Sequence, residues 1–242
     1  MKKMIKNVLN AIFMNTLSHR LVHNRLIVDS NIDVWKSLKE QGFTPRYLVD
    51  VGAARGEWTK AMMEVFPDSH YLMVDPLKEN DQTLRLITEK WANGHYWLGA
   101  VGRASGELEM NVHGDQTSMY TSEWGGGLRR VPMKTLDALV KELACGCVDG
   151  LKLDVQGAEL EVLAGAAEIL KQCKVVQVEV SFRRVYEKAP LAHEIIHFFA
   201  EQGFRIFDIA SIIKRGNDRA LLQADLFFVA DDTFCKPETW DA

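Results

Sequence analysis

The sequence contains no apolar run long enough to cross a membrane, and it carries no excess of basic charge. A transmembrane helix needs roughly 18 consecutive apolar residues, and every apolar run in this chain is shorter. The chain has 29 Lys and Arg against 33 Asp and Glu, a formal net charge of −4. General nucleic-acid binding requires a basic surface, so we expect neither a membrane span nor a nucleic-acid partner.

Cysteine is also scarce. The chain of 242 residues has four cysteines, and only Cys145 and Cys147 lie close together. No second pair stands at the spacing of a zinc site, so we expect incidental thiols in a reducing cytoplasm. The composition, 47% hydrophobic and 26% charged, is that of an ordinary globular protein.

The first 25 residues contain no acidic residue but five Lys and Arg. Apolar residues recur there at helical spacing: Ile5, Val8, Leu9, Ile12 and Phe13. The spacing predicts a basic amphipathic helix, and the asparagines that interrupt it argue against a cleaved signal peptide. Such a helix either contacts an anionic membrane surface or packs on the rest of the chain or on a second subunit of an oligomer. We expect residues 1–29 to form a helical extension and 30–242 a single domain.

Strand and helix patterns alternate after residue 30. The segments "RYLVDVG", "HYLMVDP", "HYWLGAVG", "GLKLDV" and "VVQVEVSF" are short apolar runs, typical of strands buried in a parallel sheet. Helical patterns separate most of them, including one over 158–172. Two further strand segments follow, "FRIFDIA" and "ADLFFVA". A short loop, 211–223, joins them, so we expect the final strand to be antiparallel. The sequence predicts one doubly wound α/β domain.

The first strand runs into a glycine turn, "DVGAARGEWT". Gly52 and Gly56 permit a tight turn and a close approach of a ligand to the backbone, at the sheet edge where such folds bind ligands. We place Asp50 near the mouth of this site, where its charge suits a positive amino group. Asp75, nineteen residues beyond Gly56, ends the second strand and can accept both hydroxyls of an adenosine ribose. A nucleoside with an amino-acid tail fits this pattern, as in S-adenosylmethionine.

A dinucleotide-binding fold also combines a glycine turn with a later acid. The spacing here is not Gly-x-Gly-x-x-Gly, and an antiparallel last strand is typical of methyltransferase sheets. The residues therefore favour a methyltransferase over an NAD-dependent oxidoreductase, which stays open as the alternative.

The middle of the chain carries a family resemblance. "VPMKTLDALV" followed by "GLKLDVQGAELEVLAGA" resembles the FkbM family of S-adenosylmethionine-dependent methyltransferases, and the similarity runs from about Tyr47 to Val229. The resemblance implies a Rossmann-like class I methyltransferase fold and methylation of hydroxyl oxygens on sugars or secondary metabolites. Gln156 stands where the family usually has Glu. A catalytically silent module that binds the cofactor is therefore a further alternative.

Two carboxylates are candidates for catalysis. Asp154 ends the fourth strand and Glu159 lies in the first turn of the next helix, so we expect both to reach the cleft and one to orient or deprotonate the acceptor. The alternative for Glu159 is a favourable charge at a helix N-terminus. Lys152 either faces the cleft edge or pairs with a neighbouring acid. The residues that we expect to contact the cofactor are Asp50, Gly52, Ala53, Arg55, Gly56, Asp75, Pro76, Ala100, Val101 and Asp154.

The polar stretch 113–130 contains three consecutive glycines and is predicted to be a loop that closes over the site. An ordinary surface loop is the alternative. The acceptor, a small molecule or a glycan with a free hydroxyl, is expected to contact His113, Asp115, Ser118, Tyr120 and, at the end of the fifth strand, Glu179.

The segment "HEIIH", from His193 to His197, matches the zinc signature of metalloproteases. At about 100° per residue, Leu191, Ile195, Phe198 and Phe199 gather on one side of the helix, which must be its core face. The two histidines then point to solvent, away from any cleft. We therefore expect no metal at this motif.

Overall fold

The computed structural model describes most of the chain from residue 30 onward. The described residues are 20–22, 25–27, 30–112, 127–186, 188–231 and 233.

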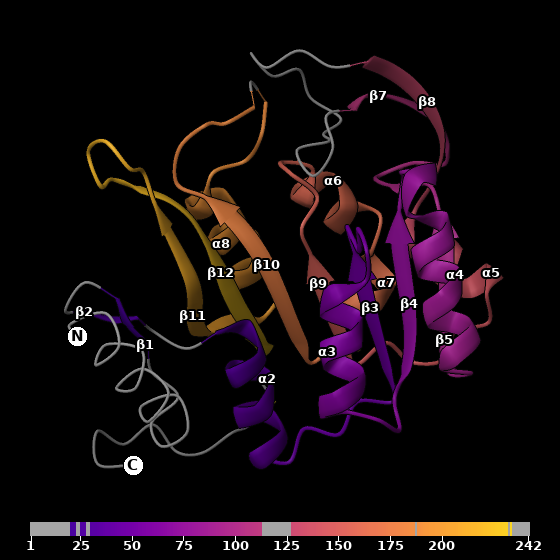
Figure 1. Ribbon diagram of the computed structural model, residues 1–242, viewed down its shortest axis with the longest axis horizontal. Helices are drawn as coiled ribbons and strands as arrows, with labels where there is room; N and C mark the ends of the chain where they lie inside the picture. The colour runs from indigo at the N-terminus through magenta and orange to yellow at the C-terminus, as the bar shows by residue number, and fades with distance from the viewer. Residues whose placement is uncertain are drawn as a thin grey trace, which may run out of the picture.

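A seven-stranded sheet forms the centre of the molecule (Figure 1). In spatial order its strands are β11 (Phe204–Lys214), β12 (Leu221–Ala230), β10 (Val175–Ser181), β9 (Gly150–Leu153), β3 (Tyr47–Val51), β4 (His70–Asp75) and β5 (Gly94–Leu98). The pairs from β10 to β5 are parallel, whereas β12 runs antiparallel to both β10 and β11. The predicted parallel sheet with an antiparallel last strand is confirmed.

Helices cover both faces of this sheet, with α2 and α3 in front of it and α8 behind it in Figure 1. One face carries α2 (Asn31–Glu40), α3 (Glu57–Val65), the 3-10 turn η1 (Lys78–Asn80) and α4 (Asp81–Lys90); the other carries α5 (Leu136–Glu142), α6 (Glu159–Ala164), α7 (Ala167–Leu170) and α8 (Ala192–Glu201).

Two cores result from the alternation of side chains along the strands. Phe227 of β12 packs edge-on against Trp35 of α2, with ring centroids 5.6 Å apart. The next residue, Phe228, stacks on Phe199 of α8 at 4.2 Å. All four rings are fully buried, so β12 fastens both helical layers to the sheet.

A second, three-stranded sheet lies beside the carboxyl ends of the central strands, with the order β6-β8-β7. Its strands are β6 (Ala100–Val101), β7 (Gly106–Val112) and β8 (Gly127–Lys134). The sequence analysis places 127–130 in a loop, which is wrong. These four residues are mostly exposed and lack a core pattern, so their strand conformation comes from pairing with β7.

Three further boundaries differ from the prediction. The helix expected over 158–172 is two helices that divide after Ala164. At the division Gly165 packs so closely on Gly102 that a Cβ would lie 2.1 Å from the carbonyl oxygen of Gly102. The apolar run "HYWLGAVG" is divided between β5 and β6, which belong to different sheets. The loop expected over 211–223 is shorter, since β11 continues to Lys214 and β12 begins at Leu221. Backbone pairing along a sheet edge extends these strands beyond their apolar segments.

The N-terminal extension is not helical where it is described. Arg20–Val22 and Arg25–Ile27 form the short strands β1 and β2, which pair antiparallel, in keeping with their aliphatic content. The helical pattern of residues 5–13 lies outside the described residues, and the domain boundary at residue 30 stays a prediction. Within the described ranges, no helix is long and apolar enough to span a membrane.

Candidate active site

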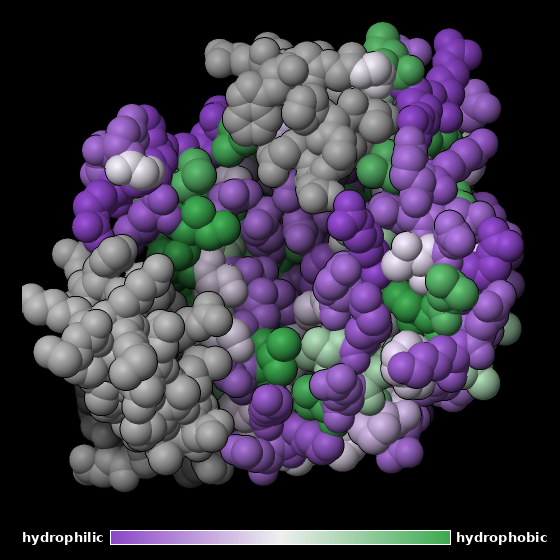
Figure 2. Space-filling view, viewed as in Figure 1, coloured by the Kyte–Doolittle hydropathy of each residue, from purple (hydrophilic) through white to green (hydrophobic). Residues whose placement is uncertain are grey.

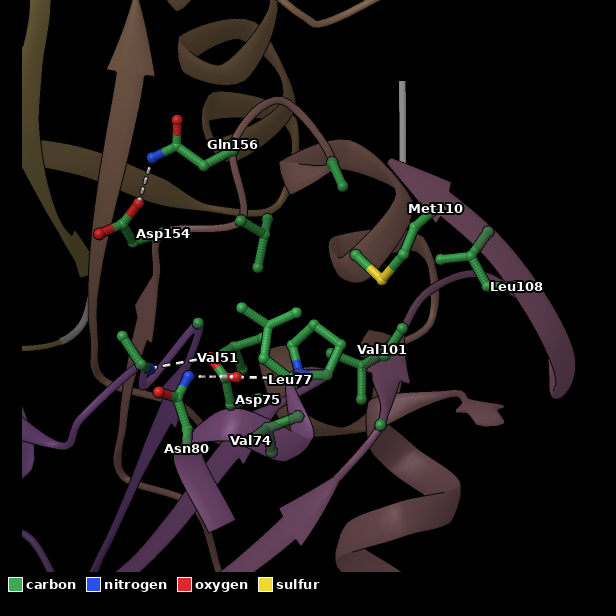
Figure 3. Close-up of a pocket in the computed structure, with 17 residues that line it drawn as sticks. Val51, Val74, Asp75, Leu77, Asn80, Val101, Leu108, Met110, Asp154 and Gln156 are labelled. Atoms are coloured by element: carbon green, nitrogen blue, oxygen red, sulfur yellow. Dashed lines mark hydrogen bonds between the residues drawn. The ribbon is translucent and has the colours of Figure 1, made fainter. Parts of the chain in front are cut away.

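A pocket opens at the carboxyl ends of β3, β4 and β9 and encloses about 860 Å³, open solvent at its mouth included. Figure 3 shows Leu108 and Met110 of β7 on the side opposite Asp154 and Gln156, with Asp75 between them. Figure 2, which has the viewpoint of Figure 1, shows a hollow near its centre that is bordered in part by hydrophilic residues.

Gly52 forms the floor of the turn after β3. Its φ of +79° is a left-handed value, and a Cβ there would lie 1.9 Å from the backbone oxygen of Asp154. Only glycine tolerates both conditions. Gly56, also left-handed, would place a Cβ 2.4 Å from the side chain of Ile87 in α4. The first glycine therefore brings two strand ends together at the pocket, whereas the second allows α3 and α4 to pack.

Asp75 is buried at the end of β4 and lines the pocket. Its Oδ2 accepts a hydrogen bond from the backbone N–H of Ala54 at 2.9 Å. Its Oδ1 accepts from the N–H of Leu77 at 2.9 Å and from Nδ2 of Asn80 at 2.8 Å. Burial raises the pKa of Asp75, and these donors lower it again in part. A carboxylate has about four acceptor positions, so roughly one remains for a ligand, fewer than the two hydroxyl contacts predicted.

Asp50 does not lie at the mouth, and that prediction is wrong. The side chain is 1% exposed because its position on β3 directs it beneath α3, where it accepts a hydrogen bond from Thr59 Oγ1 at 2.7 Å. Its Oδ1 lies 3.1 Å from Nζ of Lys152 and forms an ion pair with it. The two groups are not aligned as a hydrogen bond.

Lys152 pairs with acids, which is the second of the two alternatives. Its Nζ donates to the carbonyl oxygen of Gly52 at 2.8 Å and lies 3.7 Å from Oδ2 of Asp154. Burial lowers the pKa of Lys152, but the negative charges of Asp50 and Asp154 raise it by more, so the pKa is raised on balance. The buried ammonium therefore ties the glycine turn to both carboxylates.

The other predicted cofactor contacts divide into two groups. Gly52, Pro76, Ala100, Val101 and Asp154 line the pocket with Asp75, whereas Ala53, Arg55 and Gly56 do not. Ala53 and Gly56 are buried behind the turn and Arg55 is exposed. Lining residues that sequence reasoning missed include Asn80, Leu108 and Met110. Asn80 follows Asp75 by five residues, a local signal, but the other two required knowledge of the β7–β8 pairing.

Gln156, which lines the pocket, bridges two carboxylates. Its Nε2 donates to Oδ1 of Asp154 at 2.9 Å and to Oε2 of Glu179 at 3.0 Å (the first bond is drawn in Figure 3). Gln223 of β12 donates to the same Oε2 at 2.8 Å. Gln156 has a left-handed φ of +51°, an uncommon conformation outside glycine. The departure from the family pattern therefore places a neutral donor where Glu would add a third negative charge.

Glu179 has an unusual electrostatic environment. Burial, followed by the negative charges of Asp154, Asp225 and Glu159, raises its pKa to about 8. Asp225 is held by two amide donors, Asn31 Nδ2 and Gln177 Nε2, each at 3.0 Å. This carboxylate cluster is defined here as Asp154, Glu179 and Asp225. Asp154 directly follows β9, and Asp225 of β12 is the partner of Glu179 in the pairing of β12 with β10.

Glu159 does not reach the pocket. It is 4% exposed and accepts the backbone N–H of Gly157 at 2.9 Å, and burial raises its pKa to about 7. The structure therefore places it at the start of α6, as in the alternative interpretation, and not on the cleft. The expected acceptor contacts His113, Asp115, Ser118 and Tyr120 lie outside the described residues.

The histidines of the "HEIIH" segment point to solvent, as predicted. His193 and His197 are exposed, whereas Ile195 and Phe199 on the opposite side are buried. Nε2 of His197 lies 3.4 Å from Glu201 one turn later. In the part of the chain that the structure describes, no group of three His, Cys, Asp or Glu could hold a metal ion.

Several solved structures resemble this one at low sequence identity. A methyltransferase FkbM from Methylobacillus flagellatus KT has a TM-score of 0.49 and 17% identity over 75% of this chain and 43% of that chain. A cofactor-bound structure of Rv0187 from MTB gives 0.49 and 12% over 85% and 82%. Aeropyrum pernix fibrillarin with natively bound S-adenosyl-L-methionine gives 0.47 and 15% over 81% and 76%. The aligned part thus spans less than half of the Methylobacillus protein.

Among curated proteins, no significant match to the chain was found. The family model of the methyltransferase FkbM domain, in contrast, matches residues 50–206, which is more than half of the chain. This match includes the glycine turn, the acid that ends β4 and the carboxylates of β9 and β10. The sheet is the Rossmann-like class I methyltransferase sheet expected from the sequence. The chain belongs to the methyltransferase FkbM domain family.

Proposed function

We propose that the protein transfers a methyl group from S-adenosylmethionine to a hydroxyl oxygen of a small molecule or a glycan. One observation carries this proposal: the pocket that contains Asp75 adjoins the carboxylate cluster, and Asp154 belongs to both. A site for a nucleoside and a site that can accept a proton therefore share a boundary.

The residues of the pocket fit this cofactor. Val74, Leu77, Val101, Leu108 and Met110 offer apolar surface to a purine ring. Asp75 and Asn80 offer acceptors to a ribose, and the glycine turn admits close approach of the ligand backbone.

Asp154 takes the role that the sequence assigned to Asp50. It lines the pocket and is half-buried, so a positive amino group on the ligand would meet this carboxylate. When bound, S-adenosylmethionine supplies an electrophilic methyl group on a positively charged sulfur. The task of the chain is then to hold the acceptor hydroxyl in line and to remove its proton.

Oxygen is the favoured acceptor atom because the cluster offers carboxylates. A hydroxyl must lose its proton during transfer, and a general base increases the rate by roughly 10²–10⁴-fold. In the predicted loop 113–130, the residues His113, Asp115, Ser118 and Tyr120 stay predicted acceptor contacts.

The two alternatives predict different behaviour. An NAD-dependent oxidoreductase would bind NAD through Asp75, but its sheet is typically parallel throughout, unlike β12 here. A silent module would bind the cofactor without transfer. Gln156, the only hint of silence, forms two hydrogen bonds to carboxylates, which fits an active role equally well.

Calorimetric titration of the full chain with S-adenosylhomocysteine and, separately, with NAD tests the proposal. We expect micromolar binding of the first and none of the second. Transfer of a labelled methyl group to a panel of sugars and hydroxylated metabolites then separates an enzyme from a silent module. Binding of NAD alone would contradict the proposal.

We also propose that the basic segment 1–25 brings the protein, from the cytoplasm, to an anionic membrane surface where a glycan acceptor lies. The proposal is supported by the composition of this segment, which has five basic residues and no acidic one. Co-sedimentation with vesicles containing phosphatidylserine is expected for the full chain and not for a variant lacking residues 1–25. Equal sedimentation of both would remove this proposal and leave packing on the chain or on a second subunit.

A further inference from the structure

The two oxygens of Glu179 have different surroundings. Oε2 accepts hydrogen bonds from both Gln156 and Gln223, at 3.0 and 2.8 Å. In the described part of the chain, no hydrogen bond reaches Oε1. The side chain is half-buried at the carboxyl end of β10, so one oxygen is fixed in place and the other is available to a ligand.

We propose that Glu179 is the catalytic base that takes the proton of the acceptor hydroxyl, on Oε1. This inference rests on the proposed methyltransferase function. The sequence favoured Asp154 or Glu159 as the base and placed Glu179 mainly among the acceptor contacts. The geometry distinguishes the three carboxylates as follows.

Asp154 already has its charge engaged. Nζ of Lys152 lies 3.7 Å from Oδ2, and Gln156 donates to Oδ1. Glu159 is buried at the start of α6, with Gly157 as its donor. Glu179 combines a fixed orientation and partial exposure with an oxygen that, among the described residues, meets neither a hydrogen-bond donor nor an ammonium within 4 Å.

The groups that face Glu179 make it a strong proton acceptor. They are Asp154 and Lys152 of β9, Asp225 and Gln223 of β12, Glu159 of α6, Gln156 and the hydroxyl of Tyr186. Three carboxylates therefore surround Glu179 with negative charge, against the one positive charge of Lys152. As a result, Glu179 binds a proton more tightly than an ordinary Glu does. General bases are most effective when their pKa is near the working pH.

The proposed step balances. The acceptor oxygen forms a bond to the methyl carbon, the carbon–sulfur bond breaks with its electron pair remaining on sulfur, and the hydroxyl proton passes to Oε1 of Glu179. A positive charge on a ligand beside Glu179 would lower the pKa of this carboxyl group and so displace a proton bound there. An opposite charge within about 4–6 Å lowers a carboxyl pKa by roughly 1–3 units. After the transfer the sulfur carries no charge. The pKa of Glu179 then rises again, and its carboxyl group can hold the proton taken from the acceptor.

This charge effect provides a test that needs no known acceptor. S-adenosylmethionine carries a positive sulfur and S-adenosylhomocysteine does not, so the two ligands should differ in the protons that they release on binding. Calorimetry at pH 7.5 in HEPES and in Tris, buffers of different ionisation enthalpy, yields this number. For the wild type we expect about 0.5–0.7 more protons released with S-adenosylmethionine.

Glu179→Gln should abolish this difference while it leaves the affinity for S-adenosylhomocysteine within about threefold, which also shows that the variant is folded. Glu159→Gln is the matched control, because it removes another carboxyl group with a raised pKa. It should keep most of the difference, since Glu159 is the smallest of the three carboxylate contributions to the pKa of Glu179. Gln223→Leu removes one donor to Oε2 and should shift the midpoint of proton release to higher pH.

The outcomes separate the two claims. If neither nucleoside binds, the proposed function fails. If both bind and Glu179→Gln releases as many protons as the wild type, the methyltransferase proposal stands and the assignment of the base is overturned. Loss of the difference in Glu159→Gln instead would also overturn it.

Discussion

The carboxyl edge of the central sheet has two sides that are built differently. On the β3–β4 side, one carboxylate, Asp75, is held by three donors between apolar walls. On the β9–β10–β12 side, Asp154, Glu179 and Asp225 crowd together around amide donors and one ammonium. The first arrangement fixes a shape, as a nucleoside site requires. The second raises proton affinity, as acid–base chemistry requires.

The largest expected effect comes from the contact that joins the two sides. Gly52→Ala places a methyl group 1.9 Å from the carbonyl oxygen of Asp154 at a left-handed φ. We expect a loss of about 3 kcal/mol or more in unfolding free energy and at least about 100-fold weaker binding of S-adenosylhomocysteine, measured by urea unfolding and calorimetry.

Gly203→Ala is the control, because Gly203 has a φ of +76° with open space around it. It should cost only about 1 kcal/mol and leave ligand affinity unchanged. If Gly52→Ala behaves like this control, the two sides are not joined through Gly52.

Removing the single carboxylate of the first side should weaken binding without removing the fold. For Asp75→Ala we expect about 10–100-fold lower affinity for S-adenosylhomocysteine, the size of one lost charged hydrogen bond. Asp137→Ala is matched, since Asp137 also accepts two backbone N–H groups, from Glu168 and Ile169, but lies on the other face. Equal affinity of both variants would show that Asp75 does not contact the ligand.

These two predictions concern residues that sequence reasoning identified, and the reason is local. Gly52 and Asp75 each end a strand and carry their signal within a few residues. Glu179, Gln223 and Asp225 come together only through the register of β10 on β12, which no short pattern reveals. Asp50 was misplaced because the sequence does not show to which face of β3 its side chain points.

A smaller effect is expected from the buried carboxyl group of Glu159. The pKa of Glu159, about 7, lies above that of an unfolded Glu, about 4.5, so the folded state retains a proton that the unfolded state has lost. Its contribution to stability is complete below pH 4.5 and is lost as the pH rises through 7. Glu159→Gln has no proton to lose at this position. The unfolding free energy of the variant, relative to that of the wild type, should therefore rise by about 1–3 kcal/mol from pH 5 to pH 8.

Urea unfolding at the two pH values checks this prediction, with Glu168→Gln as the control. Glu168 is exposed and pairs with Lys171 at 2.6 Å, so its substitution should leave the pH dependence as it is. A Glu159→Gln variant with the pH dependence of the wild type would contradict the raised pKa of Glu159.

The smallest effect is expected outside both sides. A double variant, His193→Ala with His197→Ala, alters two exposed side chains on α8. Surface changes of this kind cost within about 0.5 kcal/mol each, and ligand affinity should not change. Metal analysis of both proteins by mass spectrometry should show no bound zinc. Stoichiometric zinc in the wild type that the double variant loses would contradict our account of this helix.

The most direct test of the two-sided site is a crystal structure with S-adenosylhomocysteine bound. We predict that the ribose contacts Asp75 and that the sulfur lies toward Asp154, on the side of Glu179. A nucleoside bound elsewhere, or one whose sulfur points away from the carboxylate cluster, would contradict the account.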